Sequence, residues 1–247
     1  MLVAIHQPLY LPWLGYLSRM AQADLFVLLD HVQFERRNYQ NRARIALNGE
    51  ARWLTVPLEQ RSRDESIAEK RVDNRLPGAR HWSRIHFLTL RHAYREAPHA
   101  ATVLPALRAV YERRYERLVD LSCAALEMLR EAFAIRTPLV RSSALAPQGT
   151  KSELVLDLCR RVGASALLVG LGASRRYLDR SAFARAGIAL VFQQFEHPVY
   201  RQCGAAPFAR APFLPGLSAL DLLLHCGPEA RRRLDAAAAP GTERLAA

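Results

Sequence analysis

The sequence predicts an α/β fold, in which a Rossmann-like and mostly parallel sheet is flanked by helices. Short apolar runs that fit buried strands alternate with segments of helical periodicity. A polar or glycine-rich loop follows most of these runs and precedes the next helix, which is typical of α/β proteins. The predicted buried strands are residues 2–5, 25–29, 137–141, 166–169 and 188–192.

The first thirty residues predict a compact βαβ unit. Apolar residues recur at helical spacing over 13–23, between the strands at 2–5 and 25–29. We expect the crossover to be right-handed and the two strands to be parallel. The same spacing assigns Arg19 to the polar face of this helix.

A hairpin and a helical region are predicted next. Residues 44–47 and 52–58 are expected to pair, because Asn48-Gly49 favours a turn with positive φ. The charged segment 60–78 is expected to form a mobile, surface-exposed loop. Helices are predicted over 79–96 and 102–134, so that a helical insertion at about 79–134 interrupts a single α/β domain of residues 1–247.

The C-terminal third predicts three further helices. The first runs from about 150 to 162, where Thr150 and Glu153 match the capping-box pattern. Two more are predicted around 218–225 and 228–236, and the Ala-rich tail 237–247 is expected to be frayed.

The charge of the chain favours an anionic partner. The formal net charge is +12, the pI is about 10.3, and arginine supplies nearly all of the cations. Nucleotides, nucleotide-sugars and coenzyme A esters are the candidate small molecules, and tRNA or a polar lipid head group are larger candidates. The alternative is that arginine is simply the general surface residue of an Ala/Arg-rich chain.

Several protein classes are disfavoured. No apolar run reaches the ~18 residues of a membrane-spanning helix, and the N-terminus lacks the basic region of a signal peptide. The four cysteines form no C-x-x-C pair, which argues against a zinc ribbon or a redox motif. Scattered reduced thiols suit the cytosol. We therefore expect a cytoplasmic protein.

The first candidate site lies in residues 5–16, directly after the first predicted strand. Two prolines stiffen this stretch, which also holds a histidine, a glutamine and several aromatic residues. His6 is the candidate catalytic residue, because a histidine at a strand end can bind phosphate or act as acid or base. The alternative is a structural, hydrogen-bonding histidine. The neighbouring candidates for substrate binding are Gln7, Tyr10, Trp13 and Tyr16.

The second candidate site follows the strand at 25–29. Asp30 ends that strand, at the edge of a parallel sheet where ligands usually bind, and is a candidate catalytic carboxylate for a metal, a ribose or an amine. The alternative is an aspartate that caps the following turn. Polar side chains of the next segment are candidates for substrate binding: Gln33, Asn38, Asn41 and Arg42.

A phosphate site is predicted after the strand at 166–169. Glycines there let a ligand approach the backbone, and the candidate residues are Gly170, Gly172 and Ser174. The spacing is not G-x-G-x-x-G, so a tight strand–helix turn is the alternative. Lys151 and Ser152, at the start of a predicted helix, are further candidate phosphate contacts.

The last candidate segment is 192–200. His197 beside Glu196 is a candidate acid/base residue, and Gln194 and Tyr200 are candidates for the lining of a substrate pocket. The alternative is a loop that packs aromatic residues over the core. No metal site is predicted, because the sequence has neither H-E-x-x-H nor a dense cluster of histidines and carboxylates.

Together these motifs resemble the WbqC-like family, which is named for a protein encoded in bacterial O-antigen clusters. The most specific is I-H-Q-P-x-Y-L-P-W-L-G-Y at residues 5–16. The resemblance spans nearly the whole chain, and Arg175-Arg176 adds unexpected charge to one motif. The other matching motifs lie at 23–34, 41–45, 53–57, 170–178, 197–202 and 217–223.

The resemblance implies a bacterial cytoplasmic transferase of surface-polysaccharide or secondary-metabolite biosynthesis. We expect it to move a nucleotidyl, acyl or aminoacyl group onto an amine or amino-sugar, with ATP or coenzyme A as the candidate cofactors. The start of the chain is also similar to nucleotidylyltransferase and class I synthetase-like cores, although a shared fold does not establish a reaction. The alternatives are an aminoacyl-tRNA-dependent transferase or RNA-binding protein, and a non-catalytic assembly protein.

Overall fold

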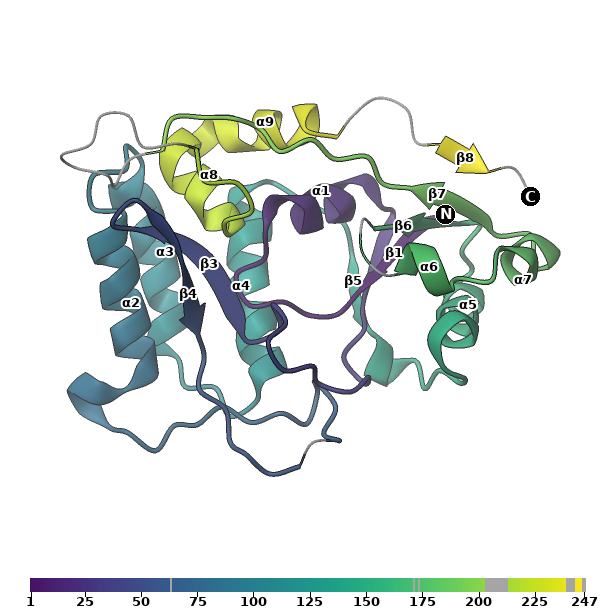
Figure 1. The fold of residues 1–247 in the computed structure, drawn as a ribbon, viewed down its shortest axis with the longest axis horizontal. Helices are drawn as coiled ribbons and strands as arrows, with labels where there is room; N and C mark the ends of the chain where they lie inside the picture. Colours follow the sequence, from purple (N-terminus) through teal and green to yellow (C-terminus); the bar gives the residue numbers. More distant parts are fainter. Residues whose placement is uncertain (63, 171, 173, 203–212, 239–242, 246–247) are drawn as a thin grey trace.

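The computed structural model describes residues 1–247 except 63, 171, 173, 203–212, 239–242 and 246–247 (Figure 1). Its centre is a six-stranded sheet in the order β5-β2-β1-β6-β7-β8. The first five of these strands are parallel, and β8 is antiparallel to β7. The α/β prediction and its Rossmann-like sheet are confirmed. The strands are β1 (Leu2–His6), β2 (Leu25–Leu28), β5 (Leu139–Arg141), β6 (Ala166–Val169), β7 (Ala189–Phe192) and β8 (Glu243–Leu245).

The direction of the strand order reverses between β1 and β6. The chain first fills one side of β1 with β2 and β5, and then crosses to the other side to form β6 and β7. In such a sheet, a ligand crevice opens at the carboxyl ends of the two strands where the direction reverses. Ala4 pairs with Leu168, so continuing the register by two residues places His6 level with Gly170.

Helices cover both faces of the sheet. Successive side chains of a strand point to opposite faces, so each buried strand supplies apolar side chains to both. Ala4 and Phe26 belong to the large core cluster on one face, whereas Val3 and Val27 belong to a cluster on the other. On the first face lie α1 (Leu14–Gln22), α4 (Leu118–Ala132), α8 (Ala219–Cys226) and α9 (Ala230–Ala236), and on the second lie α5 (Lys151–Arg161) and α7 (Arg180–Arg185).

A separate lobe lies at the left of Figure 1, away from β6 and β7. It contains the hairpin β3 (Arg42–Leu47)–β4 (Glu50–Thr55), the helix α2 (Trp82–Ala93) and the helix α3 (Ala100–Glu112). Both hairpin strands begin two residues earlier than predicted. Asn48 and Gly49 have positive φ, as expected for their turn. A short 3₁₀ turn, η1 (Gly78–Arg80), precedes α2.

The prediction of one continuous helix over 102–134 is wrong. The chain forms α3 and α4, and residues 113–117 separate them. The backbone of this separating segment bonds to the loop 60–78. Val72 N donates to Glu116 O at 3.0 Å, and Leu118 N donates to Lys70 O at 2.9 Å. Tertiary hydrogen bonds therefore replace helical ones at this position.

The loop 60–78 is not wholly exposed, contrary to the prediction. Ile67, Lys70 and Val72 are buried. The Lys70 ammonium lies 2.5 Å from the Glu65 carboxylate, so this buried cation has an acidic partner. Hydrogen bonds to the segment after α3 hold the loop against the helical lobe.

Two predictions near the end of the chain need correction. Thr150 is the N-cap residue of α5, but its side chain accepts no capping hydrogen bond, so the expected capping box does not form. Residues 243–245 of the predicted frayed tail pair with β7 as β8. In the described part of the chain, the helices are too short or too polar to cross a bilayer.

Candidate functional site

The crevice at the carboxyl ends of β1 and β6 brings together residues from three parts of the chain. His6 ends β1, Gly170 follows β6, and Tyr16 and Arg19 project from α1. A cavity of about 40 Å³ lies on the opposite, α5 side of the sheet, and Gly170 is the member of this group that lines it. Its lining includes Ile5, Leu29, Val155, Gly170 and Tyr177. We call His6, Tyr16, Arg19 and Gly170 the switch-point crevice.

His6 is held as a neutral imidazole. Its Nδ1 lies 2.9 Å from the carbonyl oxygen of Gln7, so Nδ1 carries the proton and donates it. Burial and the positive charge of Arg19 lower the pKa of His6 to about 3. The Nε2 atom then has a free lone pair, with no partner among the described residues. This histidine can accept a proton or a hydrogen bond from a ligand.

Arg19 is the residue that sequence reasoning missed. It was assigned to the polar face of its helix, yet it is only 6 % exposed. Among the described residues, its guanidinium has no hydrogen-bond acceptor and no carboxylate within ion-pair distance, and Nε is buried without a partner. Burial lowers its pKa to about 10, which leaves it protonated at neutral pH. Burying a cation without a partner costs folding free energy, so Arg19 is a candidate functional residue.

Gly170 makes room for this guanidinium. A Cβ atom at position 170 would lie 1.6 Å from Nη1 of Arg19, so the guanidinium would have to shift. The group that approaches Gly170 closely is therefore an arginine of the protein itself, and the predicted approach of a ligand stays a prediction. A sequence signal for this pairing was absent, because Arg19 and Gly170 come from distant segments.

Tyr16 completes the wall of the crevice. Its ring packs edge-on against the His6 ring, with 4.9 Å between the centroids. The side chain is fully buried, and its hydroxyl has no hydrogen-bond partner in the described structure. Burial raises the pKa of this phenol, so it remains a neutral donor.

Asp30 is buried beside the crevice, but its carboxylate is already saturated. Oδ2 accepts from Arg141 Nε at 2.6 Å and from the Ser143 hydroxyl at 2.8 Å. Oδ1 accepts from the Ser142 hydroxyl at 3.0 Å and from Ser143 N at 2.9 Å. Burial alone would raise the pKa of Asp30, but the bonds from Ser143 and Arg141 outweigh it and hold the pKa below its usual value. This geometry suits a residue that fixes the loop after β5.

The side chains of the first motif, residues 5–16, lie in different parts of the structure. Tyr10 points into the helical lobe, where its hydroxyl lies 3.0 Å from His86 Nδ1 and is bonded to the Tyr111 hydroxyl. Gln7 accepts a hydrogen bond from Gln40. Trp13 packs edge-on against Phe195, at the start of α1. Of the five motif residues that were predicted to form a site, only His6 and Tyr16 share the crevice with Arg19.

The polar side chains after Asp30 mainly form contacts with other residues of the neighbouring loops and hairpin. Gln33 is exposed and bonds to Asp64, and Asn38 bonds to Glu35. Asn41 donates to the carbonyl oxygen of Val56 at 2.9 Å. Arg42 stacks over Trp53, 4.0 Å from the ring centroid. Their predicted roles in substrate binding stay predictions.

The predicted phosphate contacts lie at the start of α5 and around α6 (Ser174–Tyr177). Lys151 is exposed at the first position of α5, and the Ser152 hydroxyl accepts from Asp179 N at 2.8 Å. Gly172 is exposed, and Ser174 begins α6. Residues 171 and 173 of this segment lie outside the described residues.

The segment after β7 forms a second buried polar cluster. Asp221 of α8 accepts from the hydroxyl of Tyr200 at 2.6 Å and from that of Tyr94 at 3.0 Å. Gln194 is exposed. His197 is half-buried, burial lowers its pKa, and its buried Nε2 has no partner in the described structure. Tyr200 thus anchors this segment, while the predicted acid/base role of His197 stays a prediction.

No group of three or more potential metal ligands occurs among the described residues. The switch-point crevice instead combines one cation, the arginine, with two uncharged groups, the histidine and the buried phenol. It is suited to an anionic ligand with a group that can donate a proton to His6.

Comparison with known proteins agrees with the motifs. The model of the WbqC-like protein family matches residues 7–233. The chain belongs to the WbqC-like family. The match includes Tyr16, Arg19 and Gly170, so the crevice lies almost wholly within the family region.

A relative in Mycobacterium tuberculosis, named uncharacterized protein Rv1507c, is 29 % identical over 231 residues. The alignment covers 92 % of this chain and 95 % of that protein, so the likeness extends over both whole chains. No solved structure matches this chain. The WbqC-like assignment and the geometry of the crevice are therefore the basis for a functional proposal.

Proposed function

We propose that this WbqC-like protein is a transferase that binds an anionic small molecule in the switch-point crevice. The observation that carries the proposal is Arg19, a buried guanidinium with no acidic partner among the described residues. Its planar set of donors matches a carboxylate or a phosphate. Candidate ligands are a nucleotide, a nucleotide-sugar or a coenzyme A ester.

The geometry also suggests how binding would prepare the reaction. Burial is the main cause of the low pKa of His6, and the positive charge of Arg19 lowers it further. An anion bound to Arg19 would neutralise this field and raise the pKa of His6 toward the range of a useful base. Binding of the correct substrate would thus activate the histidine.

The proposed reaction transfers a nucleotidyl, acyl or aminoacyl group to an amine or amino-sugar. The amine nitrogen bonds to the phosphorus or carbonyl carbon of the donor, and the bond from that atom to the leaving phosphate or thiolate breaks. His6 Nε2 takes the proton that the amine loses. Tyr16 is positioned to donate a hydrogen bond, and Asp30 holds the adjacent loop through Arg141 and Ser143.

A thermal-unfolding assay tests this proposal. Wild-type protein is heated with ATP, coenzyme A or UDP-N-acetylglucosamine, and at least one ligand is expected to raise the Tm. A ligand at about 100 times its Kd stabilises the folded state by about 2.7 kcal/mol. Arg19→Met is expected to reduce the shift by the part that comes from the crevice, whereas Arg160→Met, which changes an exposed arginine of α5, should retain it in full. A shift in Arg19→Met that equals the wild-type shift for every ligand would overturn the assignment.

A second candidate function is an aminoacyl-tRNA-dependent transferase. The net charge of +12 favours it, as do the exposed Arg36 and Arg37 in the loop after β2. This loop lies near α6, because Glu35 contributes to the raised pKa of Tyr177. Binding of tRNA should then weaken steeply with salt. Absence of binding at low salt excludes this candidate.

A further inference from the structure

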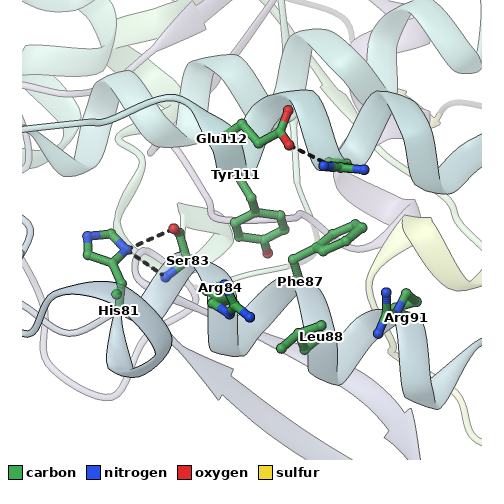
Figure 2. A pocket seen from close by; sticks show the side chains of 10 residues that line it. His81, Ser83, Arg84, Phe87, Leu88, Arg91, Tyr111 and Glu112 are labelled. Atoms are coloured by element: carbon green, nitrogen blue, oxygen red, sulfur yellow. Dashed lines mark hydrogen bonds and ion pairs between the residues drawn. The ribbon is translucent and has the colours of Figure 1, made fainter.

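A pocket outside the switch-point crevice lies between α2 and α3 of the helical lobe. It has a volume of about 460 Å³, within the range of small-molecule sites. Figure 2 shows Arg84, Leu88 and Arg91 along α2, opposite Glu112 of α3. We call it the α2–α3 pocket. None of the predicted site residues lines it, so sequence motifs gave no sign of it.

The lining of the α2–α3 pocket is cationic. Arg108 is paired with Glu112, with 2.6 Å between Nε and the carboxylate. Arg84 and Arg91 are exposed and have no ion-pair partner among the described residues. The pocket therefore offers two uncompensated guanidinium groups to an anion.

The rest of the lining is apolar and aromatic. Phe87, Leu88 and Tyr111 form it, and Leu88 remains 37 % exposed although it is a large hydrophobic residue. Figure 2 shows the rings of Phe87 and Tyr111 next to each other, between the two helices. Aromatic and aliphatic surfaces of this type bind planar rings by stacking and by excluding water.

A buried hydrogen-bond chain holds the Tyr111 ring in place. His86 Nε2 donates to the carbonyl oxygen of Thr55 at 3.1 Å, so its Nδ1 is the acceptor for the Tyr10 hydroxyl. The Tyr10 hydroxyl is in turn bonded to that of Tyr111. Burial lowers the pKa of His86 to about 4, so this arrangement persists at neutral pH. The aromatic wall is thus preorganised, which reduces the entropy lost on binding.

We propose that the α2–α3 pocket binds a nucleoside polyphosphate, with its base against Phe87, Leu88 and Tyr111 and its phosphates on Arg84 and Arg91. The two arginines are seven residues apart on one helix, which separates their Cα atoms by about 10 Å along the axis. A chain of phosphates spans such a distance better than a single carboxylate. This site is distinct from the crevice and does not depend on the function proposed there.

Photolabelling with 8-azido-ATP tests the inference. The full-length protein is irradiated with the probe, digested, and the labelled peptides are identified by mass spectrometry. Label on α2 or α3 is expected, and excess ATP should suppress it. If label appears only on peptides of the crevice, or on none, the inference is overturned. If α2 or α3 is labelled but the crevice is not, the inference stands and nucleotide binding in the crevice fails.

Two double variants test whether the two arginines bind the ligand. In Arg84→Gln/Arg91→Gln, we expect ATP affinity at the α2–α3 pocket to fall about tenfold or more. The control Arg136→Gln/Arg160→Gln removes the same charge from exposed arginines outside both sites and should keep the affinity within about twofold. Equal losses in both pairs would show a nonspecific effect of net charge and overturn the assignment.

Discussion

The switch-point crevice and the α2–α3 pocket both contain arginines that have no ion-pair partner in the described part of the chain, but their environments are opposite. In the crevice, one guanidinium is 6 % exposed, and it lies among a neutral histidine, a buried phenol and the backbone of Gly170. In the pocket, Arg84 and Arg91 are exposed on the surface of a helix. Electrostatic interactions are stronger where water is excluded, and they are screened by salt where it is not.

This difference decides what each charge contributes to folding. Burial of Arg19 without an acidic partner among the described residues lowers the stability of the fold, which is the reason we propose an anionic ligand for it. Arg84 and Arg91 remain hydrated, so their charges lower the free energy of unfolding very little. Their proposed role in ligand binding therefore rests on the volume and the aromatic wall of their pocket. A buried cation is therefore evidence of a site by itself, whereas exposed cations need a shaped surface around them.

Acid pH is expected to produce the largest effect, because each region contains one buried neutral histidine. The folded protein protonates His6 at about pH 3 and His86 at about pH 4, whereas the unfolded chain binds these protons near pH 6.5. The unfolded state therefore gains protons first as the pH falls. Between pH 6.5 and 4.5, the free energy of unfolding should fall by about 1.4 kcal/mol per pH unit for each histidine.

Urea unfolding at several pH values measures this slope. His6→Gln and His86→Gln should each remove about 1.4 kcal/mol per pH unit of it, which compares the two regions directly, and His31 and His197, whose pKa values burial also lowers, account for a further part. The carboxylates with lowered pKa values, such as Asp30, lose their contribution only as the pH falls below the unfolded value near 4. A wild-type stability that stays constant down to pH 5 would contradict the buried, neutral state of both histidines.

Asp30→Asn tests the framework of the crevice. The substitution removes the charge that faces Arg141 and disturbs the bonds from Ser142 and Ser143. We expect the free energy of unfolding to fall by about 2 to 4 kcal/mol, since Asp30 is fully buried but Arg141 is partly exposed. Asp120→Asn, whose exposed carboxylate lies 3.4 Å from the same arginine, is the control and should change it by less than about 1 kcal/mol.

Arg19→Met separates function from stability in the crevice. Removal of an uncompensated buried cation is expected to raise the free energy of unfolding by about 1 to 2 kcal/mol, while ligand binding is lost. Chemical denaturation without ligand measures the first effect, and the Tm shift with ligand measures the second. A variant destabilised by more than 1 kcal/mol would show that Arg19 has a structural role instead.

Arg84→Gln/Arg91→Gln should give the smallest change in stability. Exposed side chains without ion-pair partners contribute little to folding, so the free energy of unfolding should stay within about 0.5 kcal/mol of the wild type. Urea unfolding of the unliganded variant provides the measurement. A larger loss would mean that the arginines hold α2 against α3 and would weaken the contrast between the two regions.

Much of the sheet was predictable, because each strand carries its own local signal. Apolar runs such as Leu2–His6 and Ala166–Val169 fit buried parallel strands whatever packs on them. The turn at Asn48-Gly49 depends on the φ preferences of those two residues. His6 and Gly170 were identified because both directly follow apolar strands, and a parallel sheet brings such positions to one edge.

The remaining features depended on contacts between distant segments. The helix predicted over 102–134 breaks because residues 113–117 find hydrogen bonds to the loop 60–78, which helical periodicity does not encode. Tyr10 turns toward Tyr111 and His86, although the motif grouped it with His6. The α2–α3 pocket forms between side chains that look like ordinary solvated arginines and core residues in the sequence.

The sequence by itself determined the α/β class, the strands and the family, because hydrophobic periodicity and motif residues are local properties of the chain. It could not place Arg19, since an arginine on one helical face is normally solvated. Only the tertiary structure decided that this residue is buried against Gly170, because α9 and the segment after β7 pack on α1 and remove the solvent from its polar face. Burial depends on what covers a residue, and that is set by the whole fold.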